Sequence, residues 1–232
     1  RYPLLVLAIV VAVVLVGGYH MKTGSRMETN LDKYMPQDHP AFVYSDEVED
    51  VFSVKDAIII AIEDENSVYN FETLELIKKL TRTIQKHEHV TKADVTSLYT
   101  GDNIIGSDGE LKIRKFYQRT PKTAEKLTEL REMVRGNSLV RGRLVSEDET
   151  VAMIIVKIDE TALDQADEKE LYDWLGGLLT KQEGTQILRM AGRPIVEGTL
   201  AKLAPKDMKT MVPIVIGVIV IHQIEFRKKI AV

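Results

Sequence analysis

The residues whose types could support chemistry are few and lie far apart in this chain. His87 and His89, one residue apart, come closest to a metal-ligand pattern. A structural metal site needs about four ligands and a catalytic one about three from the protein. No third ligand follows at a meaningful spacing, so we interpret the pair as surface histidines at the end of a helix.

The serines, glycines and acidic residues match no functional motif either. Ser97 and Ser146 have no base partner that the sequence identifies, and the chain lacks G-x-S-x-G, P-loop and H-E-x-x-H motifs. GDNIIG at 101–106 lacks the glycine spacing of a phosphate cradle. SDEVED at 45–50 lacks the glycine and spaced oxygen ligands of a calcium loop, so we interpret it as a solvated helix face. We therefore predict no catalytic residue, no metal ligand, no cofactor and no enzyme.

Charge is strongly segregated along the chain. Of 232 residues 44% are hydrophobic, and the formal net charge is −4. All but four of the 31 Lys and Arg and all but one of the 35 Asp and Glu lie between His20 and Thr210, which gives that region a net charge of −7. Without a basic stripe, nucleic acid is not an expected partner. The absence of cysteine excludes disulfides, thiolate metal sites and cysteine catalysis.

An uncharged segment, PLLVLAIVVAVVLVGGY, covers Pro3–Tyr19. Its 17 residues fit a transmembrane helix at the short end of the usual range of about 17–25. They also fit a signal peptide, with Val16–Gly18 as a passable cleavage site. The presence of a second apolar segment favours the membrane anchor.

That second segment is Met211–Ile221, eleven apolar residues in a row. A membrane span needs about 20 apolar residues, and a run of this length also fits a buried core helix or strand. Its residues are apolar on every helix face, however, and the Lys-containing amphipathic stretch Glu197–Met211 leads into it. We interpret the run as a truncated membrane helix.

The flanking charges predict an orientation for both segments. Arg1 precedes the first segment and Arg227–Lys229 follow the second. Lys and Arg collect on the cytoplasmic side of a membrane, so both ends are expected in the cytoplasm and residues 20–210 outside it. Because the chain begins with Arg1, we expect a fragment or a processed product.

The middle of the chain alternates between strand and helix patterns. Apolar runs predict strands at Asp56–Asp64, His89–Tyr99, Val151–Ile158 and Gln186–Met190, the third of them after a turn at Glu147–Glu149. Turn dipeptides around two short apolar pieces predict a hairpin or loop excursion within 101–116.

Helices are predicted between these strands. Asn70 is a plausible cap for a helix whose buried face is Leu74, Ile77, Leu80 and Ile84 and which ends at His87. Thr120–Pro121 would start another, which has Ala124, Leu127, Leu130 and Val134 on its face and ends at Gly136–Asn137. A third contains Leu171, Trp174, Leu175 and Leu178. A short helix is expected at about Tyr44–Phe52.

This order of elements predicts an α+β fold. Strand-helix-strand, an inserted hairpin and helix, and a second strand-helix-strand fit the split βαβ, ferredoxin-like plan. We divide the chain into a transmembrane helix at 1–19, a connector with a short helix at 20–53, an extracytoplasmic domain at 54–210, a truncated second transmembrane helix at 211–221 and an aberrant or cytoplasmic tail at 222–232.

Seven segments after the first apolar helix resemble, in order, the start of an RND-superfamily exporter of the MMPL-like, hydrophobe-exporting type. They are NLDKYMPQDHPAF, VFSVKDAIIIAIED, FETLELIKKLTRTIQ, VTSLYTGDNIIG, GRLVSEDETVAMIIVKI, AGRPIVEG and KDMKTMVPIVI. The likeness covers about residues 1–221 and ends after Ile221. In the family the last helix stays apolar for about ten more residues, so a frameshift, a gene end or an assembly error is the expected cause of the different tail.

The resemblance implies a porter domain outside the cytoplasmic membrane, between the first two transmembrane helices of a multi-pass protein. Such a domain contains ferredoxin-like units and helps to form the path of a lipophilic substrate. The energy for transport comes from proton or ion flux. The coupling carboxylates of the superfamily lie in later helices, so no functional residue is carried over to this chain.

We therefore expect a part of an exporter of lipids or other hydrophobic or amphiphilic compounds. Its expected partners are the bilayer, the lipophilic substrate and the remaining transmembrane helices, and self-association is left open. The alternatives are a membrane-anchored exterior binding or accessory domain without transport activity and a relative that handles polypeptides. Tyr99–Gly106 and Gly192–Pro194 are candidate substrate-path residues, but turns that the fold itself needs are the favoured explanation.

Overall fold

The computed structural model describes most of the chain from β1 onward. The described residues are 56–107, 110–158 and 165–230, and before them 5, 9, 12–13, 16–20, 31–34, 36, 38–41, 43–44 and 47. The predicted membrane segment at 1–19 and the connector at 20–53 thus lie largely outside the described residues, as do SDEVED and most of the short helix predicted at Tyr44–Phe52. Within them, residues 16–20 are helical and Leu31–Tyr34 form a 3-10 turn, η1.

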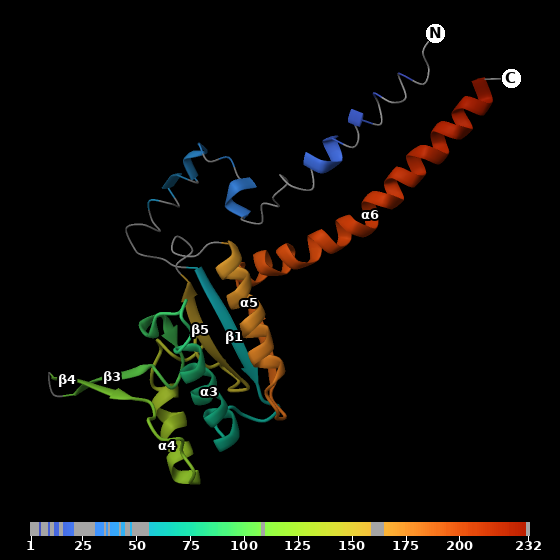
Figure 1. Cartoon of the computed structure of the whole chain (residues 1–232). Helices are drawn as coiled ribbons and strands as arrows, with labels where there is room; N and C mark the ends of the chain where they lie inside the picture. The colour runs from blue at the N-terminus through green and yellow to red at the C-terminus, as the bar shows by residue number, and fades with distance from the viewer. Residues whose placement is uncertain are drawn as a thin grey trace.

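A four-stranded antiparallel sheet in the order β2-β5-β1-β6 forms the centre of the fold (Figure 1). Helix α3 connects β1 with β2, and helix α5 connects β5 with β6. Because β5 lies between β1 and β2, and β1 between β5 and β6, each connection passes over one strand. The predicted α+β class is confirmed. The bounds are β1 Asp56–Glu63, α3 Phe71–Ile84, β2 Val95–Thr96, β5 Val151–Ile158, α5 Gln165–Thr180 and β6 Ile187–Ala191.

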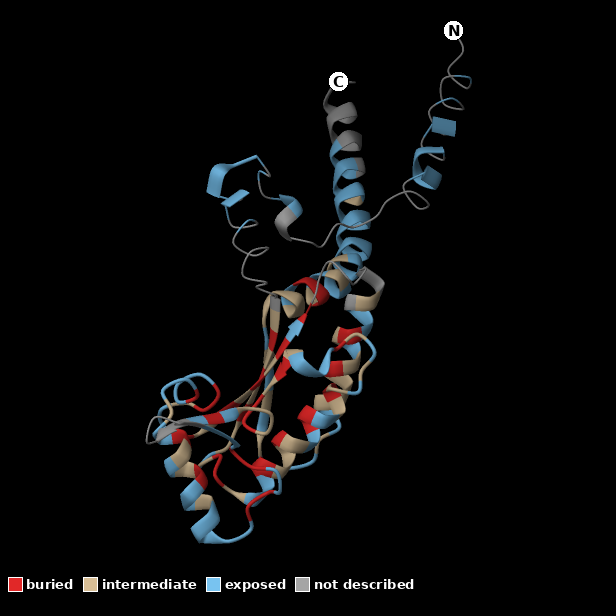
Figure 2. Cartoon of the chain, turned by 90° about the vertical axis from the view of Figure 1, so that its left-hand side faces the viewer, coloured by how far each residue is buried: buried red, intermediate tan, exposed pale blue. Residues whose placement is uncertain are grey.

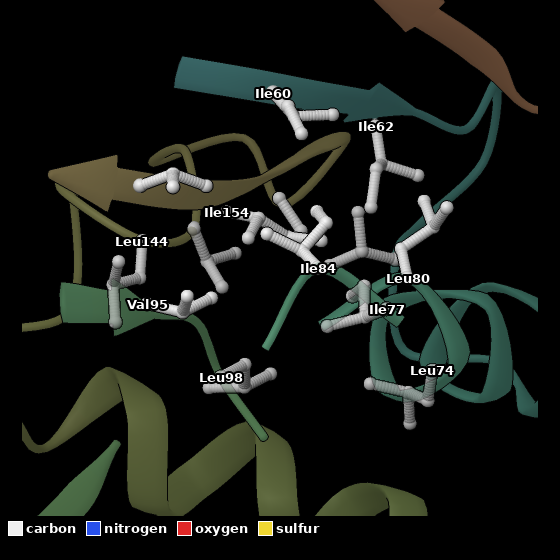
Figure 3. Close-up of a cluster of buried hydrophobic side chains, with 14 of the residues drawn as sticks. Ile60, Ile62, Leu74, Ile77, Leu80, Ile84, Val95, Leu98, Leu144 and Ile154 are labelled. Atoms are coloured by element: carbon white, nitrogen blue, oxygen red, sulfur yellow. The ribbon is translucent and has the colours of Figure 1, made fainter. Parts of the chain in front are cut away.

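One face of the sheet packs against the helices. Side chains alternate between the two faces of a strand, and every second residue of β5 is buried. On β1, Ile58, Ile60 and Ile62 are buried at the same alternation. Helix α3 brings its predicted face against them (Figure 3), and Leu171 and Leu175 of α5 join the same cluster. Figure 2 shows these buried positions running along the sheet and the facing sides of the helices.

Helix α3 begins where the sequence predicts it. The side chain of Asn70 accepts a hydrogen bond from the backbone N–H of Thr73 at 2.8 Å, which satisfies one of the free amides of the first turn. The helix ends at Ile84, before the predicted end at His87, and Gln85 is its C-terminal cap.

The second predicted strand, His89–Tyr99, is wrong in length, because only Val95–Thr96 pair as β2. A 3-10 turn, η2 (Lys92–Asp94), precedes it. Beyond it, the backbone N–H of Ser97 donates to the hydroxyl of Thr100 at 2.8 Å, which replaces a ladder hydrogen bond by a local one. Leu144 lies along the part of the β5 edge that β2 leaves unpaired. Its carbonyl accepts a hydrogen bond from the N–H of Met153 at 2.9 Å.

The insertion between β2 and β5 contains a hairpin, as predicted, and helix α4 (Ala124–Arg135). Strands β3 (Asp102–Ser107) and β4 (Glu110–Lys115) pair antiparallel and project from the domain (Figure 1). The predicted helix start at Thr120–Pro121 is wrong. The hydroxyl of Thr120 donates to the carboxylate of Glu75 on α3, and Thr123 caps α4 instead. The helix ends at Arg135 with Gly136 as its C-terminal cap, as predicted.

Helix α6 extends from Arg193 to Ile230 and is continuous through the predicted boundaries at 211 and 222. Pro205 and Pro213 lie inside it and each lacks the N–H of a helix hydrogen bond. Figure 1 shows α6 leaving the domain beside α5 and curving away from it. No helix in the described part of the chain is both long and apolar enough to cross a membrane.

Candidate functional site

The two histidines lie where the end of α3 meets α5. The ring of His87 packs against Trp174 with 4.3 Å between the ring centroids, and the rings of His87 and His89 are 5.5 Å apart. The imidazole of His89 is 21% exposed, with Asp167 Oδ1 at 3.8 Å from Nε2. They are therefore more buried than surface histidines. Burial, reinforced by His89, lowers the pKa of His87. Among the described residues no group of three acidic, His or Cys side chains could hold a metal.

The two serines make structural contacts. Ser97 is fully buried, and its Oγ accepts from the Thr81 hydroxyl at 2.9 Å and from the backbone N–H of Tyr99 at 3.2 Å. Ser146 Oγ donates to Asp148 Oδ1 at 2.6 Å and accepts from the N–H of Val151 at 2.9 Å. These bonds hold turns beside β2 and β5.

The first candidate segment, Tyr99–Gly106, borders a hollow of about 450 Å³ with a mixed lining at the β2 edge of the sheet. Its rim carries Lys115, whose ammonium lies 2.9 Å from Asp102 Oδ1 and donates to the Thr100 carbonyl at 2.7 Å. Gly101 N–H donates to the Ser97 carbonyl at 2.8 Å, and a Cβ on Gly101 would lie 3.1 Å from that same oxygen. The turn itself thus accounts for this glycine.

The second candidate segment, Gly192–Pro194, connects β6 with α6. Gly192 has a φ of +126°, and a Cβ there would overlap the carbonyl oxygen of Ala57 on β1. Only glycine meets both conditions without strain. The guanidinium of Arg193 donates to the buried carboxylate of Glu197 at 3.1 Å. The segment fixes the direction in which α6 leaves the sheet.

Further contacts hold the first turns of α6 against α5. Gly198 lies so close to Tyr172 that a Cβ there would be 2.9 Å from the ring. The hydroxyls of Tyr172 and Thr199 share a hydrogen bond of 3.0 Å. The base of α6 is thus anchored to the folded domain.

The structure does not bring the two candidate segments together. Tyr99–Gly106 follows β2 and Gly192–Pro194 follows β6, and these strands are the opposite edges of the sheet. A single site built from both is therefore excluded.

A hollow that sequence reasoning missed lies between α5 and the edge strand β6. This groove has a volume of about 420 Å³. Leu188 and Met190, which pair with Ile62 and Ile60 of β1, form its apolar floor together with Leu179. Gln182 and Gln186 add amides. Such a surface can bind an apolar group without catalysing a reaction on it. The only sequence signal is the apolar alternation of β6, which does not show that the strand is an edge.

A hydrogen-bonded network around the carboxylate of Asp64 adjoins this groove through Gln186. Asp64 accepts hydrogen bonds from Thr73 Oγ1 at 2.8 Å, Asn70 Nδ2 at 2.9 Å and Gln186 Nε2 at 3.3 Å. Burial alone would raise the pKa of Asp64, but these bonds and one from the backbone N–H of Asn66 outweigh it and lower the pKa to about 2. The carboxylate joins the end of β1 to the start of α3.

The buried carboxylate of Glu149 holds α4 in place. Glu149 has a φ of 64° and a side chain that is only 9% exposed. Its two oxygens accept from the Nε atoms of Arg131 and Arg135, both at 2.6 Å. Hydrogen bonding from Arg131, followed by that from Arg135, lowers the pKa of Glu149. This cluster joins the turn before β5 to α4.

The largest exposed apolar surface in the described part of the chain lies on α6. Ile214 is 60% exposed and Ile221 62%. Figure 2 shows the outer part of α6 as almost wholly exposed where it is described. Exposed apolar patches of this extent mark protein or membrane contacts. Its exposed large side chains are Met208, Met211, Val212, Ile214, Val215, Ile216, Val218, Ile219 and Ile221.

Comparisons with protein-family models and with curated proteins found no match for this chain.

Proposed function

We propose that this chain supplies the exterior porter domain of an RND-type membrane exporter of lipophilic compounds, driven by proton or ion flux. The observation that carries the proposal is α6. It starts from the edge strand of a folded domain at Gly192, is fixed there by Tyr172 and Thr199, and then exposes apolar side chains from Met211 to Ile221. A helix of this kind suits a domain that stands on a bilayer, with 211–221 entering it.

The strand order supports a ferredoxin-like assignment for the domain. Two crossover connections, α3 and α5, interleave so that each passes over one strand of an antiparallel sheet. That is the arrangement of a split βαβ fold. Together with the seven family-like segments, it favours a porter domain over an unrelated anchored domain.

The groove between α5 and β6 supports the proposal that the substrate is lipophilic. Leu179, Leu188 and Met190 give its lining apolar contacts, and Thr180, Gln182 and Gln186 add uncharged polar ones. A mixed lining without charged side chains suits a hydrophobic or amphiphilic compound better than a charged one. We assign contact with the moving substrate to this groove.

Export is tested by the accumulation of a fluorescent lipophilic dye in native cells. Deletion of the gene should raise dye accumulation, and a chromosomal Leu188→Gln, Met190→Gln allele should raise it as well, because it makes the groove polar. Ile187→Gln is the matched control on the opposite face of the same strand, where the side chain is 49% exposed. Unchanged accumulation after deletion contradicts the exporter and favours the anchored accessory domain.

The absence of cysteine permits a clean test of topology. Single-cysteine variants Lys112→Cys, on β4, and Lys228→Cys, near the end of α6, would be treated with a membrane-impermeant maleimide. We expect Lys112→Cys to react in intact cells and Lys228→Cys to react only after permeabilisation. The reverse pattern contradicts the exterior location of the domain.

A further inference from the structure

Three lysines form a stripe on α6 just before its apolar part. Lys202, Lys206 and Lys209 are all exposed and follow one another at spacings of four and three. At 3.6 residues per turn these spacings place the three within a wedge of about 60° on the helix surface. The stripe thus lies on one side of the helix and ends two residues before Met211.

The position of Lys202 shows which side of the helix this is. Its ammonium donates to Asp173 Oδ1 of α5 at 3.2 Å. Lys206 and Lys209 therefore extend from the same side of α6 as Lys202, one and two turns farther along the helix. Along the helix they stand between the folded domain and the apolar residues.

Among the described residues, no acidic side chain pairs with the two outer lysines. Asp207 is the acidic residue of this turn, and it points about 100° away from Lys206. Within the described part of the chain, neither Lys206 nor Lys209 forms an ion pair. Two cations thus lie side by side at the border of an apolar surface.

We propose that Lys206 and Lys209 bind anionic lipid headgroups of the bilayer that α6 enters, on the side where the folded domain stands. This inference rests on the proposed function, since it needs α6 to meet a membrane. The occupant follows from charge complementarity and from continuity with the apolar surface. Lysine stems lie along apolar surface while the ammonium stays at the polar boundary, which is where lipid phosphates lie.

The expected size of the effect follows from general membrane electrostatics. One basic residue near an anionic surface strengthens binding about 5-fold. Two lysines should therefore give a preference for anionic over zwitterionic lipid of up to about 25-fold. The preference should collapse near 1 M salt, where the Debye length is about 3 Å.

The test uses the full chain reconstituted into phosphatidylcholine vesicles that contain a small share of spin-labelled phosphatidylglycerol or spin-labelled phosphatidylcholine. The measured quantity is the fraction of each lipid that the protein immobilises. We expect phosphatidylglycerol to be preferred, and Lys206→Gln, Lys209→Gln to abolish most of that preference. Lys206→Arg, Lys209→Arg should keep it. Lys112→Gln, Lys126→Gln makes the same change of net charge at exposed positions on β4 and α4, and it should leave the preference intact.

Each other outcome overturns the inference in a distinguishable way. Equal immobilisation of the two lipids by the unmodified chain contradicts the headgroup site. It does not contradict the proposal that α6 enters the membrane. An equal loss with the Lys112, Lys126 pair means that overall charge, and not the stripe, attracts the lipid. If the chain does not float with vesicles of any composition, the proposed function fails and the inference fails with it.

Discussion

The hydroxyl group of Tyr69 makes no hydrogen bond in the described part of the chain. Its ring is 9% exposed, and its hydroxyl is buried without a hydrogen-bond partner among the described residues. Burial, and then the charge of Glu149, raises the pKa of Tyr69, so the hydroxyl keeps its proton. An unsatisfied buried hydroxyl destabilises the folded state.

We therefore expect Tyr69→Phe to raise the free energy of unfolding by about 1 kcal/mol. Denaturant unfolding in detergent, followed by circular dichroism, measures the change. Tyr117→Phe is the control, because the Tyr117 hydroxyl donates to the carbonyl of Leu74 at 2.9 Å and its loss should destabilise. A loss of stability in Tyr69→Phe would mean that the hydroxyl has a partner, such as a buried water.

Substitution of Asp64, in contrast to Tyr69→Phe, should lower the free energy of unfolding. Asp64→Asn replaces a carboxylate by an amide whose own N–H groups face the donors of Thr73, Asn70 and Gln186. We expect a loss of about 2 kcal/mol at pH 7, typical of hydrogen bonds to a charged group.

The pH dependence of this effect follows from the lowered pKa of Asp64. A carboxyl whose pKa is about 2 when folded and 3.8 in the reference state stabilises the fold fully above about pH 4. That stability is lost as pH falls through 2. The two proteins should thus converge in stability at low pH. Glu65→Gln, at the exposed neighbouring position, should show no such convergence, and a constant difference between Asp64→Asn and the parent at all pH values would contradict the assignment.

Local signals made some of these residues predictable. Asn70 is recognisable as a cap because an apolar helix face follows it directly. The choice between Thr120 and Thr123 is not local, because Glu75, far away in the sequence, engages the Thr120 hydroxyl. The unsatisfied Tyr69 and the buried Glu149 likewise depend on contacts between distant segments, which no spacing pattern contains.

At the scale of elements, the contact of His87 with Trp174 connects the end of α3 to α5. Because the pKa of His87 is lowered in the folded state, the unfolded chain binds more protons just below pH 6.5. The free energy of unfolding should therefore fall as pH drops below about 6.5. His87→Phe should weaken this fall, and its phenyl ring can still pack against the indole of Trp174.

The fluorescence of Trp174, the single tryptophan, reports unfolding in this experiment. His39→Gln is the control, since His39 is exposed and lies before the sheet. If the pH dependence of His87→Phe equals that of the parent protein, His87 does not carry it.

The elements that were predicted well are those whose pattern is complete within their own residues. Strands β1 and β5 and helix α3 have long apolar runs or a full helical face, and their predicted spans match to within a few residues. Strand β2 was overestimated because its neighbour Leu144 competes for the same edge of β5. The groove at α5 and β6 depends on the order of the strands, which the sequence does not contain.

At the scale of the whole molecule, Gly192 joins the sheet to the long helix. We expect Gly192→Ala to lower the free energy of unfolding by about 3 kcal/mol or more, because the added Cβ meets Ala57 and the backbone angle is one that alanine rarely adopts. Denaturant unfolding measures it.

Gly177→Ala is the matched control for that experiment. It lies within α5, and no atom is near its Cβ position. Alanine is the better helix former by about 1 kcal/mol, so this variant should be more stable than the parent. Equal stability of Gly192→Ala and the parent would show that α6 can leave the sheet by another route.

The strand order also has a consequence for how the domain is made. The central strand β1 leaves the ribosome early, but its partners are Val151–Ile158 and Ile187–Ala191, roughly a hundred residues later. Until Ala191 has been synthesised, β1 has an unpaired edge and its isoleucines have no complete core. Such exposed edges invite aggregation. The sheet can therefore be completed only as synthesis of α6 begins.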